Sequence, residues 1–136
     1  MYTCRHFLIK ELIPPDLSHP KQWAALWRLF DDRLLRAADL LRDEYGPMTV
    51  NDWIWGGGYT DSGLRLPGSE YYSFTSQHSH GRALDLKPQD AEVQRIREDI
   101  IGRKKSWMGL ITGVELDVEW LHIDTRNAEE LHMFRP

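Results

Sequence analysis

The chain has 136 residues, of which 41% are hydrophobic and 28% are charged, and its formal net charge is −4. This length and composition are typical of one globular domain, so we expect residues 1–136 to share a single core. An acidic chain lacks the basic surface of a general nucleic-acid binder, and we expect no nucleic-acid partner. The one cysteine, Cys4, excludes an internal disulfide and a multi-thiolate zinc knot, so any metal needs nitrogen and oxygen ligands.

The N-terminal residues MYTCRHFLIKEL lack the apolar region and the small-residue cleavage site of a signal peptide. No apolar run approaches the length of about 20 residues that a membrane span needs. We therefore expect a protein that is made in the cytoplasm and does not insert into a membrane. If it acts elsewhere, another factor must deliver it.

The first half of the chain predicts one long helix between shorter elements. Residues 7–15 form a short ordered segment that a Pro-Pro pair ends. Residues 20–45 carry apolar side chains at helical spacing, with a proline at the start and a Gly-Pro pair after the end. Residues 48–55 are rich in β-branched and aromatic side chains and predict a strand. The polar residues 56–81 follow, and so long a loop is more often functional than idle.

The second half predicts strands and a shorter helix. Residues 83–87 form a short strand that a proline ends. Residues 91–102 predict a helix, for which the aspartate before it is a suitable N-cap. Residues 107–118 and 119–125 predict two strands joined by a turn, and residues 130–136 add an edge strand. Helices combined with several mostly antiparallel strands favour the α+β class.

Two apolar strands each contain a polar residue that a core does not accept without a partner. Asp85 lies in the run ALDL, where burying an aspartate is costly unless it is paired or bound to a cation. His122 lies in the run WLHID, with Glu119 three residues before it, and His78 lies in the polar loop before the strand of Asp85. Taken singly, a strand histidine is more often a hydrogen-bonded structural residue, and an aspartate beside a turn is more often a cap.

The combination indicates a metal site. Two histidines and one aspartate form a set of three ligands that leaves zinc an open position for water. A glutamate that is not a ligand supplies a general base, as in the His-Glu-x-x-His peptidases. The strand period of two puts Glu119 and His122 on opposite faces, so we expect Glu119 on the turn before the strand. Spacing alone supports the zinc-hydrolase and structural interpretations about equally.

Other polar and aromatic residues have weaker context. We expect none of the remaining histidines to be a ligand, namely His6, His19, His80 and His132. Asp124 shares the strand face of His122, where it either supports that histidine or pairs with Arg126. The aromatic residues of the long loop either wall a groove or pack internally; they are Tyr59, Tyr71, Tyr72 and Phe74.

Three ordered motifs resemble a known family. SQHSHGRALD, residues 76–85, resembles the Ser-x-His-x-x-Gly-x-Ala-x-Asp signature of the zinc D-Ala-D-Ala carboxypeptidases. Their relatives include the vancomycin-resistance dipeptidases and the phage L-alanyl-D-glutamate endolysins. EWLH, residues 119–122, is similar to their second signature, Glu-x-x-His, and DSGLRLP, residues 61–67, is similar to their Ser-Gly-x-Arg segment. The resemblance covers roughly residues 48–126, although residues 57–75 align only around the arginine.

The resemblance implies three ligands of Zn²⁺, namely His78, Asp85 and His122. It implies Glu119 as the catalytic base and Arg65 as the residue that stabilises the developing oxyanion or binds a substrate carboxylate. Ser76 is implied to support the zinc site or to hydrogen-bond the substrate. The implied fold is the α+β Hedgehog/DD-peptidase fold, a small antiparallel sheet with packed helices.

The implied activity is zinc-dependent hydrolysis of peptidoglycan stem peptides, at either L-Ala-D-Glu or D-Ala-D-Ala. A catalytic domain without a signal peptide fits a phage-type lysin that is released through a holin or carried in a virion and acts on the cell wall. It also fits a cytoplasmic dipeptidase. The acidic charge weakens the endolysin interpretation, because many wall-lytic proteins carry a basic surface.

Two other interpretations stay open. One is a non-catalytic zinc-binding structural or virion module on the same fold, and the other is an α+β domain whose histidines and aspartate are only structural. The presence of Glu119 favours the enzyme, because a structural zinc site needs no base beside it.

Overall fold

The polypeptide folds around one mixed β-sheet, and a computed structural model describes all 136 residues. The strand order is β1-β2-β4-β3-β5, and each neighbouring pair is antiparallel except β3 with β5, which is parallel. The strands are short: β1 (Met48–Thr49), β2 (Ala83–Pro88), β3 (Gly113–Glu115), β4 (Leu121–Asp124) and β5 (His132–Phe134). The sheet is therefore mostly antiparallel, with one parallel edge.

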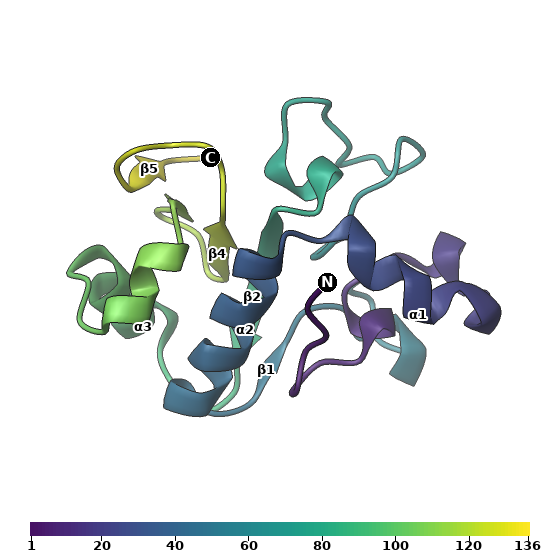
Figure 1. The fold of residues 1–136 in the computed structure, drawn as a ribbon, viewed down its shortest axis with the longest axis horizontal. Helices are drawn as coiled ribbons and strands as arrows, with labels where there is room; N and C mark the ends of the chain where they lie inside the picture. The colour runs from purple at the N-terminus through teal and green to yellow at the C-terminus, as the bar shows by residue number, and fades with distance from the viewer.

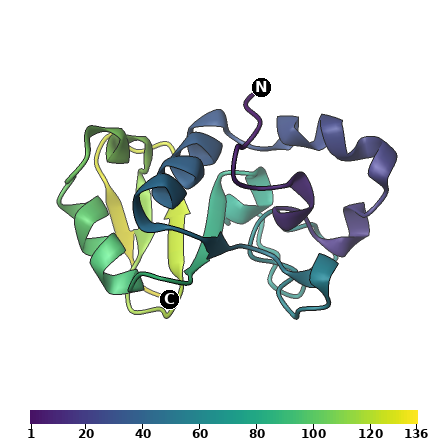
Figure 2. The ribbon, with the colours of Figure 1, turned by 90° about the horizontal axis from the view of Figure 1, so that it is seen from below.

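Three α-helices accompany the sheet: α1 (Trp23–Leu26), α2 (Asp32–Tyr45) and α3 (Val93–Ile101). Helix α2 packs against β2, and α3 packs against β4. The N-terminal segments and α1 lie at one end of the molecule, whereas α3 and β5 lie at the other (Figures 1 and 2). This arrangement confirms the predicted α+β class. None of the helices combines the length and the apolar character that a membrane crossing requires.

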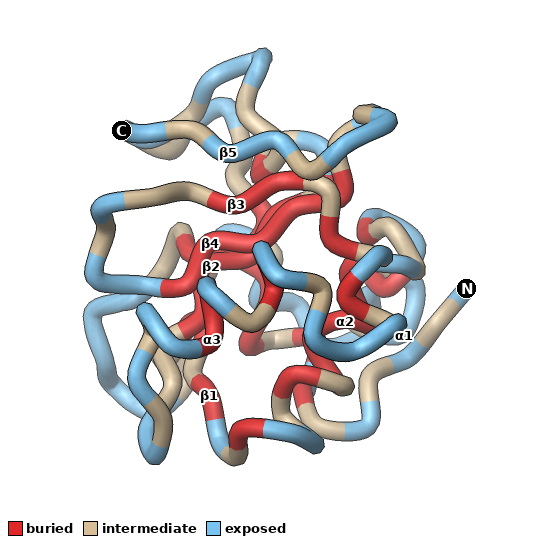
Figure 3. Tube along the Cα trace, turned by 90° about the vertical axis from the view of Figure 1, so that its left-hand side faces the viewer, coloured by how far each residue is buried: buried red, intermediate tan, exposed pale blue.

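The two faces of the sheet differ, because side chains alternate along each strand. On β2, Leu84 and Leu86 are fully buried in the core that includes α2 and α3, and Asp85 between them points to the opposite face. Strand β4 repeats the pattern, with His122 between two core residues. These strands run through the buried centre of the molecule (Figure 3). The helices therefore cover an apolar face, while the other face presents polar side chains.

The predicted single helix over residues 20–45 is wrong, because the chain breaks it before α2. Turns of 3-10 helix flank α1, and Phe30 then has an extended backbone with φ −108° and ψ 143°. Asp31 caps α2, because its carboxylate accepts a hydrogen bond from the backbone N–H of Arg33 at 2.8 Å. The backbone N–H of Asp31 donates to the carbonyl of Gly81 at 2.9 Å. The break thus buries Phe30 and attaches the start of α2 to the loop before β2.

Two predicted strands are shorter in the structure. Of residues 48–55, only β1 is a strand, and residues 53–55 form a 3-10 turn. The carbonyl of Ile13 accepts hydrogen bonds from the side chains of Trp53 at 2.8 Å and Asn51 at 3.0 Å, so this stretch is held to the N-terminal segment instead of the sheet. Residues 106–110 also form a 3-10 helix, which leaves β3 as the one strand within residues 107–118.

The other predicted elements are present with shifted bounds. Strands β2 and β4 match the predicted strands at 83–87 and 119–125, and β5 is the predicted edge strand. Helix α3 begins two residues later than predicted, and Glu92 stands at its N-cap position in place of Asp90, without a side-chain capping bond. The N-terminal segment contains a 3-10 turn at Ile9–Glu11.

Gly113 leaves room for the buried carboxylate of Asp124. The β3–β4 register places these two residues opposite each other, and Asp124 is fully buried. A Cβ atom on Gly113 would overlap the carboxyl group of Asp124. A side chain at this position must therefore displace Asp124.

We expect Gly113→Ala to destabilise the fold by about 1–3 kcal/mol, as is typical of overpacking at a buried position. Urea unfolding measures the difference from wild type. Gly109→Ala is the matched control, because a Cβ atom there meets no atom within 4 Å. Equal unfolding midpoints for the two variants would contradict the steric role of Gly113.

Candidate metal centre

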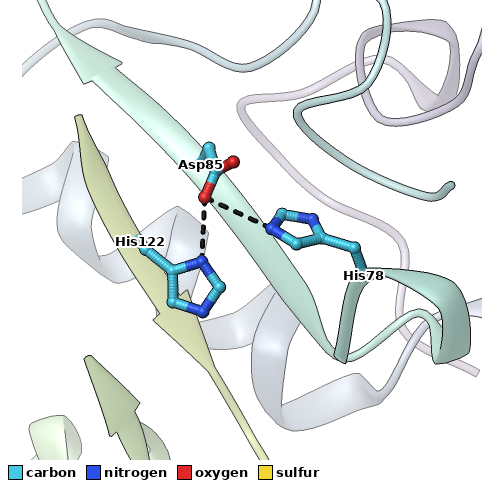
Figure 4. Close-up of side chains that lie close together, drawn as sticks. All are labelled: His78, Asp85 and His122. Carbon is cyan, nitrogen blue, oxygen red and sulfur yellow. Dashed lines mark hydrogen bonds and ion pairs between the residues drawn. The ribbon is translucent and has the colours of Figure 1, made fainter. Parts of the chain in front are cut away.

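Two stretches that are far apart in the sequence bring His78, Asp85 and His122 together, because the first two lie seven residues apart and His122 lies much later in the chain (Figure 4). His78 lies on a 3-10 turn at Gln77–His80, Asp85 on β2, and His122 on β4. One nitrogen or oxygen atom from each residue lies within 4.8 Å of the others, and all three residues are buried. The β2–β4 register places Asp85 directly opposite His122. A buried group of two nitrogens and one carboxylate can hold a metal ion.

The 3-10 turn fixes how His78 faces Asp85. The Nδ1 atom of His78 lies 2.9 Å from the carbonyl oxygen of Gly63. Because a carbonyl only accepts, Nδ1 is the donor to Gly63, and Nε2 points to Asp85 Oδ1 at 3.3 Å. Ser76 caps the turn, since its hydroxyl oxygen accepts from the backbone N–H of His78 at 3.3 Å. Gly81 then ends the turn in the left-handed region, with φ 66°.

His122 lies between two carboxylates. Its Nδ1 atom is 2.9 Å from Asp85 Oδ1, and its Nε2 atom is 2.9 Å from Asp124 Oδ2. Arg126 donates to the same Asp124 carboxylate, with Nε at 2.8 Å from Oδ1. Asp124 therefore has both of the roles considered from the sequence: it supports His122 and pairs with Arg126. This contact directs the Nδ1 atom of His122 toward the other two residues.

The electrostatics of the centre favour positive charge. Burial alone would lower the pKa of His122, but hydrogen bonds and charge from Asp124 and Asp85 outweigh burial and raise this pKa to about 9. Burial likewise opposes ionisation of Asp85, but the charges and hydrogen bonds of His78 and His122 hold the pKa of its carboxyl well below the usual range. An ionised carboxylate between two imidazoles is the environment that a bound cation needs.

The centre lies in a cleft made of two adjoining cavities, which share Arg65, Asp85 and Trp120. The first, the Tyr59 arm, has a volume of about 620 Å³. Its other linings include Tyr59, Asp61, Ser62, Tyr71, Lys87 and Glu119. The second, the Phe134 arm, has a volume of about 450 Å³. Its other linings include Ser76, His78, Glu115, His122, Arg126 and Phe134.

Arg65 and Glu119 both line this cleft. Arg65 Nη2 lies 3.3 Å from Asp85 Oδ2, and Arg65 Nε donates to the carbonyl of Asp61 at 2.8 Å, so the guanidinium is held where the two arms meet. Glu119 lies on the bend before β4, as the strand period predicts, and is exposed. Its carboxylate forms no hydrogen bond or ion pair with another residue of the chain. The cleft thus contains one fixed guanidinium and one unpaired carboxylate beside the metal ligands.

Residues expected to have no metal role lie apart from the ligand group. His80 is exposed, and its Nε2 atom lies 2.7 Å from the carbonyl of Phe74. His6 pairs with Asp43, His19 is exposed, and the ring of His132 stacks on Phe134 at the rim of the cleft. Of the aromatic residues in the long loop, Tyr59 and Tyr71 line the cleft, whereas Phe74 and Tyr72 do not.

The sequence interpretation missed several residues of the cleft, among them Lys87, Trp120 and Glu115. Lys87 follows Asp85 by two residues and therefore shares its strand face, which the strand period could have indicated. Trp120 lies inside the Glu-x-x-His motif but was considered only as an apolar neighbour. Glu115 lies on β3, and the sequence contains no signal for the register that brings it to the cleft.

Comparison of the chain with protein-family models, with curated proteins and with solved structures gives no match. The chemistry of the centre and the sequence motifs are therefore the grounds for a functional proposal.

We expect the purified protein to bind one equivalent of Zn²⁺, and His122→Ala to abolish this binding at micromolar metal, because the ligand set falls from three to two. Isothermal titration with Zn²⁺ measures both. His80→Ala is the matched control, because it removes a neighbouring histidine that lies outside the ligand group. Identical titrations for wild type and His122→Ala would show that these residues hold no metal.

Proposed function

We propose that the protein is a zinc-dependent peptidase that hydrolyses peptidoglycan stem peptides, at either L-Ala-D-Glu or D-Ala-D-Ala. The observation that carries the proposal is that His122, from the second motif, joins His78 and Asp85, from the first, in one buried group at a cleft. Arg65 and Glu119, the other residues that the resemblance implies, line the same cleft. The α+β arrangement is compatible with the Hedgehog/DD-peptidase fold, which is part of the proposal.

The donor set fits zinc. Two imidazole nitrogens and one carboxylate oxygen, without a thiolate, are typical of catalytic zinc sites that keep an open position. His78 would bind through Nε2 and His122 through Nδ1, because their other nitrogens face Gly63 and Asp124. When bound, zinc supplies Lewis acidity that polarises a carbonyl group and lowers the pKa of water to about 7.

Glu119 is the general base in this proposal. Its carboxylate has no partner in the chain and lines the Tyr59 arm together with Asp85 and Arg65. Both oxygens are therefore available to accept a proton from water and to pass it to the leaving amine. Because Glu119 lies on a bend and not in a strand, its side chain is free to move between the water and the leaving amine.

Arg65 and Ser76 support the reaction from fixed positions. The guanidinium of Arg65 is held by the carbonyl of Asp61 and by Asp85, and it faces the cleft with further N–H groups. It can donate hydrogen bonds to the oxyanion that develops on the scissile carbonyl or to a substrate carboxylate. Ser76 supports the ligand His78 through the turn, and its own O–H can still donate to the substrate.

The cleft suits a peptide that carries carboxylate groups. The rings of Tyr59, Tyr71 and Trp120 line the Tyr59 arm, and Lys87 and Arg65 add positive charge there. Stem peptides combine a short backbone with free carboxylates, which such a lining can bind. The proposal includes action on the cell wall after release through a holin or delivery by a virion.

One observation favours a second candidate function. Glu119 is exposed and forms no hydrogen bond or ion pair, so no such interaction holds it beside the three proposed ligands. A non-catalytic zinc-binding module, such as a virion component, would keep the ligands and would not need Glu119.

Digestion of purified peptidoglycan separates the two candidates. We expect zinc-loaded wild type to release peptide fragments, and Glu119→Gln to be about 10²–10⁴-fold slower while it binds the same amount of zinc, because only the proton acceptor is lost. Mass spectrometry of the fragments measures the rate and names the bond that is cut. Glu130→Gln is the control, because this exposed residue lies outside both arms of the cleft. Zinc binding without any released fragment would favour the non-catalytic module.

A further inference from the structure

A row of polar side chains crosses three strands on the open face of the sheet. The β2–β4 register places Asp85 opposite His122, and the β3–β4 register, extended by one residue, places Glu115 opposite His122 on its other side. The side chains follow the register: His122 Nδ1 lies 2.9 Å from Asp85 Oδ1 and 3.9 Å from Glu115 Oε2. The ligand nitrogen of His122 therefore has a carboxylate on each side.

Glu115 has no partner other than this histidine. Its side chain is only 14% exposed and lines the Phe134 arm with the three ligands. It accepts no hydrogen bond, and His122 is the one charged group within 4.0 Å. A carboxylate this well covered is costly unless a positive charge lies close to it. A cation bound at the neighbouring ligands would offset the free-energy cost of burying the Glu115 carboxylate.

The two other carboxylates of the centre already have arginine partners. Arg65 lies 3.3 Å from Asp85, and Arg126 lies 2.5 Å from Asp124. Asp85 is the only anionic ligand in the group, so a divalent cation there would keep a positive charge that Asp85 balances only in part. Glu115 is the remaining carboxylate of the same cavity, and it forms no ion pair with an arginine.

We propose that Glu115 is the second carboxylate of the metal centre and balances the charge of the bound cation from the β3 side. Donor atoms that share one zinc ion lie about 3.4 Å apart, so an oxygen at 3.9 Å from His122 Nδ1 is close to the cation position. Glu115 is a positioning residue that holds the cation through charge, and it differs from Glu119, which lines the other arm. This role requires the zinc centre of the proposed function but not its peptidase activity.

Zinc affinity tests the role directly. Competition with a chromogenic chelator gives the dissociation constant of Zn²⁺ for wild type, Glu115→Gln, Glu115→Asp and Glu119→Gln. We expect Glu115→Gln to bind zinc at least about ten-fold more weakly, as is typical when a residue that supports the ligands is lost. Glu115→Asp keeps the charge and should retain most of the affinity. Glu119→Gln is the matched control, because it removes the same charge from the other arm and should stay within about two-fold of wild type.

Other results of the zinc-affinity measurements would overturn the role of Glu115 or the proposed function. Wild-type affinity in Glu115→Gln overturns the role, and so does an equal loss in Glu119→Gln, which would indicate a general charge effect. If Glu115→Gln fails to unfold cooperatively, the zinc affinity of Glu115→Asp tests the role instead. A ten-fold loss of zinc affinity in this variant, which keeps the negative charge, would exclude charge balance as the role of Glu115. No zinc binding by wild type overturns both this role and the proposed function. A selective loss in Glu115→Gln, with intact peptidoglycan in the digestion, overturns only the peptidase activity.

Discussion

The antiparallel pairing of β2 with β4 is the constraint on which the centre depends. It places Asp85 opposite His122, and the residues on either side of each lie in the core, namely Leu84, Leu86, Leu121 and Ile123. If either strand slipped by one residue, its polar side chain would turn into the core and its apolar ones would leave it, at a cost of several kcal/mol. The apolar pattern that builds the core therefore also fixes the distance between the two ligands.

Around this pair, neighbouring groups decide which atom of each ligand faces the centre. The carbonyl of Gly63 and the carboxylate of Asp124 each contact one nitrogen of a histidine and leave its other nitrogen facing the ligand group, where it could bind a metal ion. Asp124 can do so only because Gly113 opposite it has no side chain. These contacts also set the competition between a proton and a cation, since the carboxylates that raise the pKa of His122 would equally stabilise a metal there. The supporting groups thus determine both the geometry and the charge of the centre.

The sequence predicts the parts of the structure that have a long or distinctive pattern. Asp85 and His122 stand out because each interrupts an apolar strand, and both strands are present. The helix break at Phe30 was missed because apolar spacing continues through it, and only the Asp31 cap marks it. Strands of two or three residues, such as β1 and β3, carry too few residues for a period to be recognised. Glu115 enters the site through the pairing of β3 with β4, which the sequence does not specify.

Two glutamates beside one centre suit different tasks because their backbones differ. Glu119 is exposed on a bend without partners, and a base needs this freedom because it must take a proton in one position and deliver it in another. Glu115 is covered and held by a strand that pairs on both sides, and a charge that balances a cation is most effective when it is fixed and poorly solvated. If the roles were exchanged, the covered Glu115 would have to carry the proton while its strand is paired on both sides. Water would screen the charge of the exposed Glu119 from the cation. The backbone around each glutamate therefore suits the role proposed for it, proton transfer on the bend before β4 and charge balance on β3.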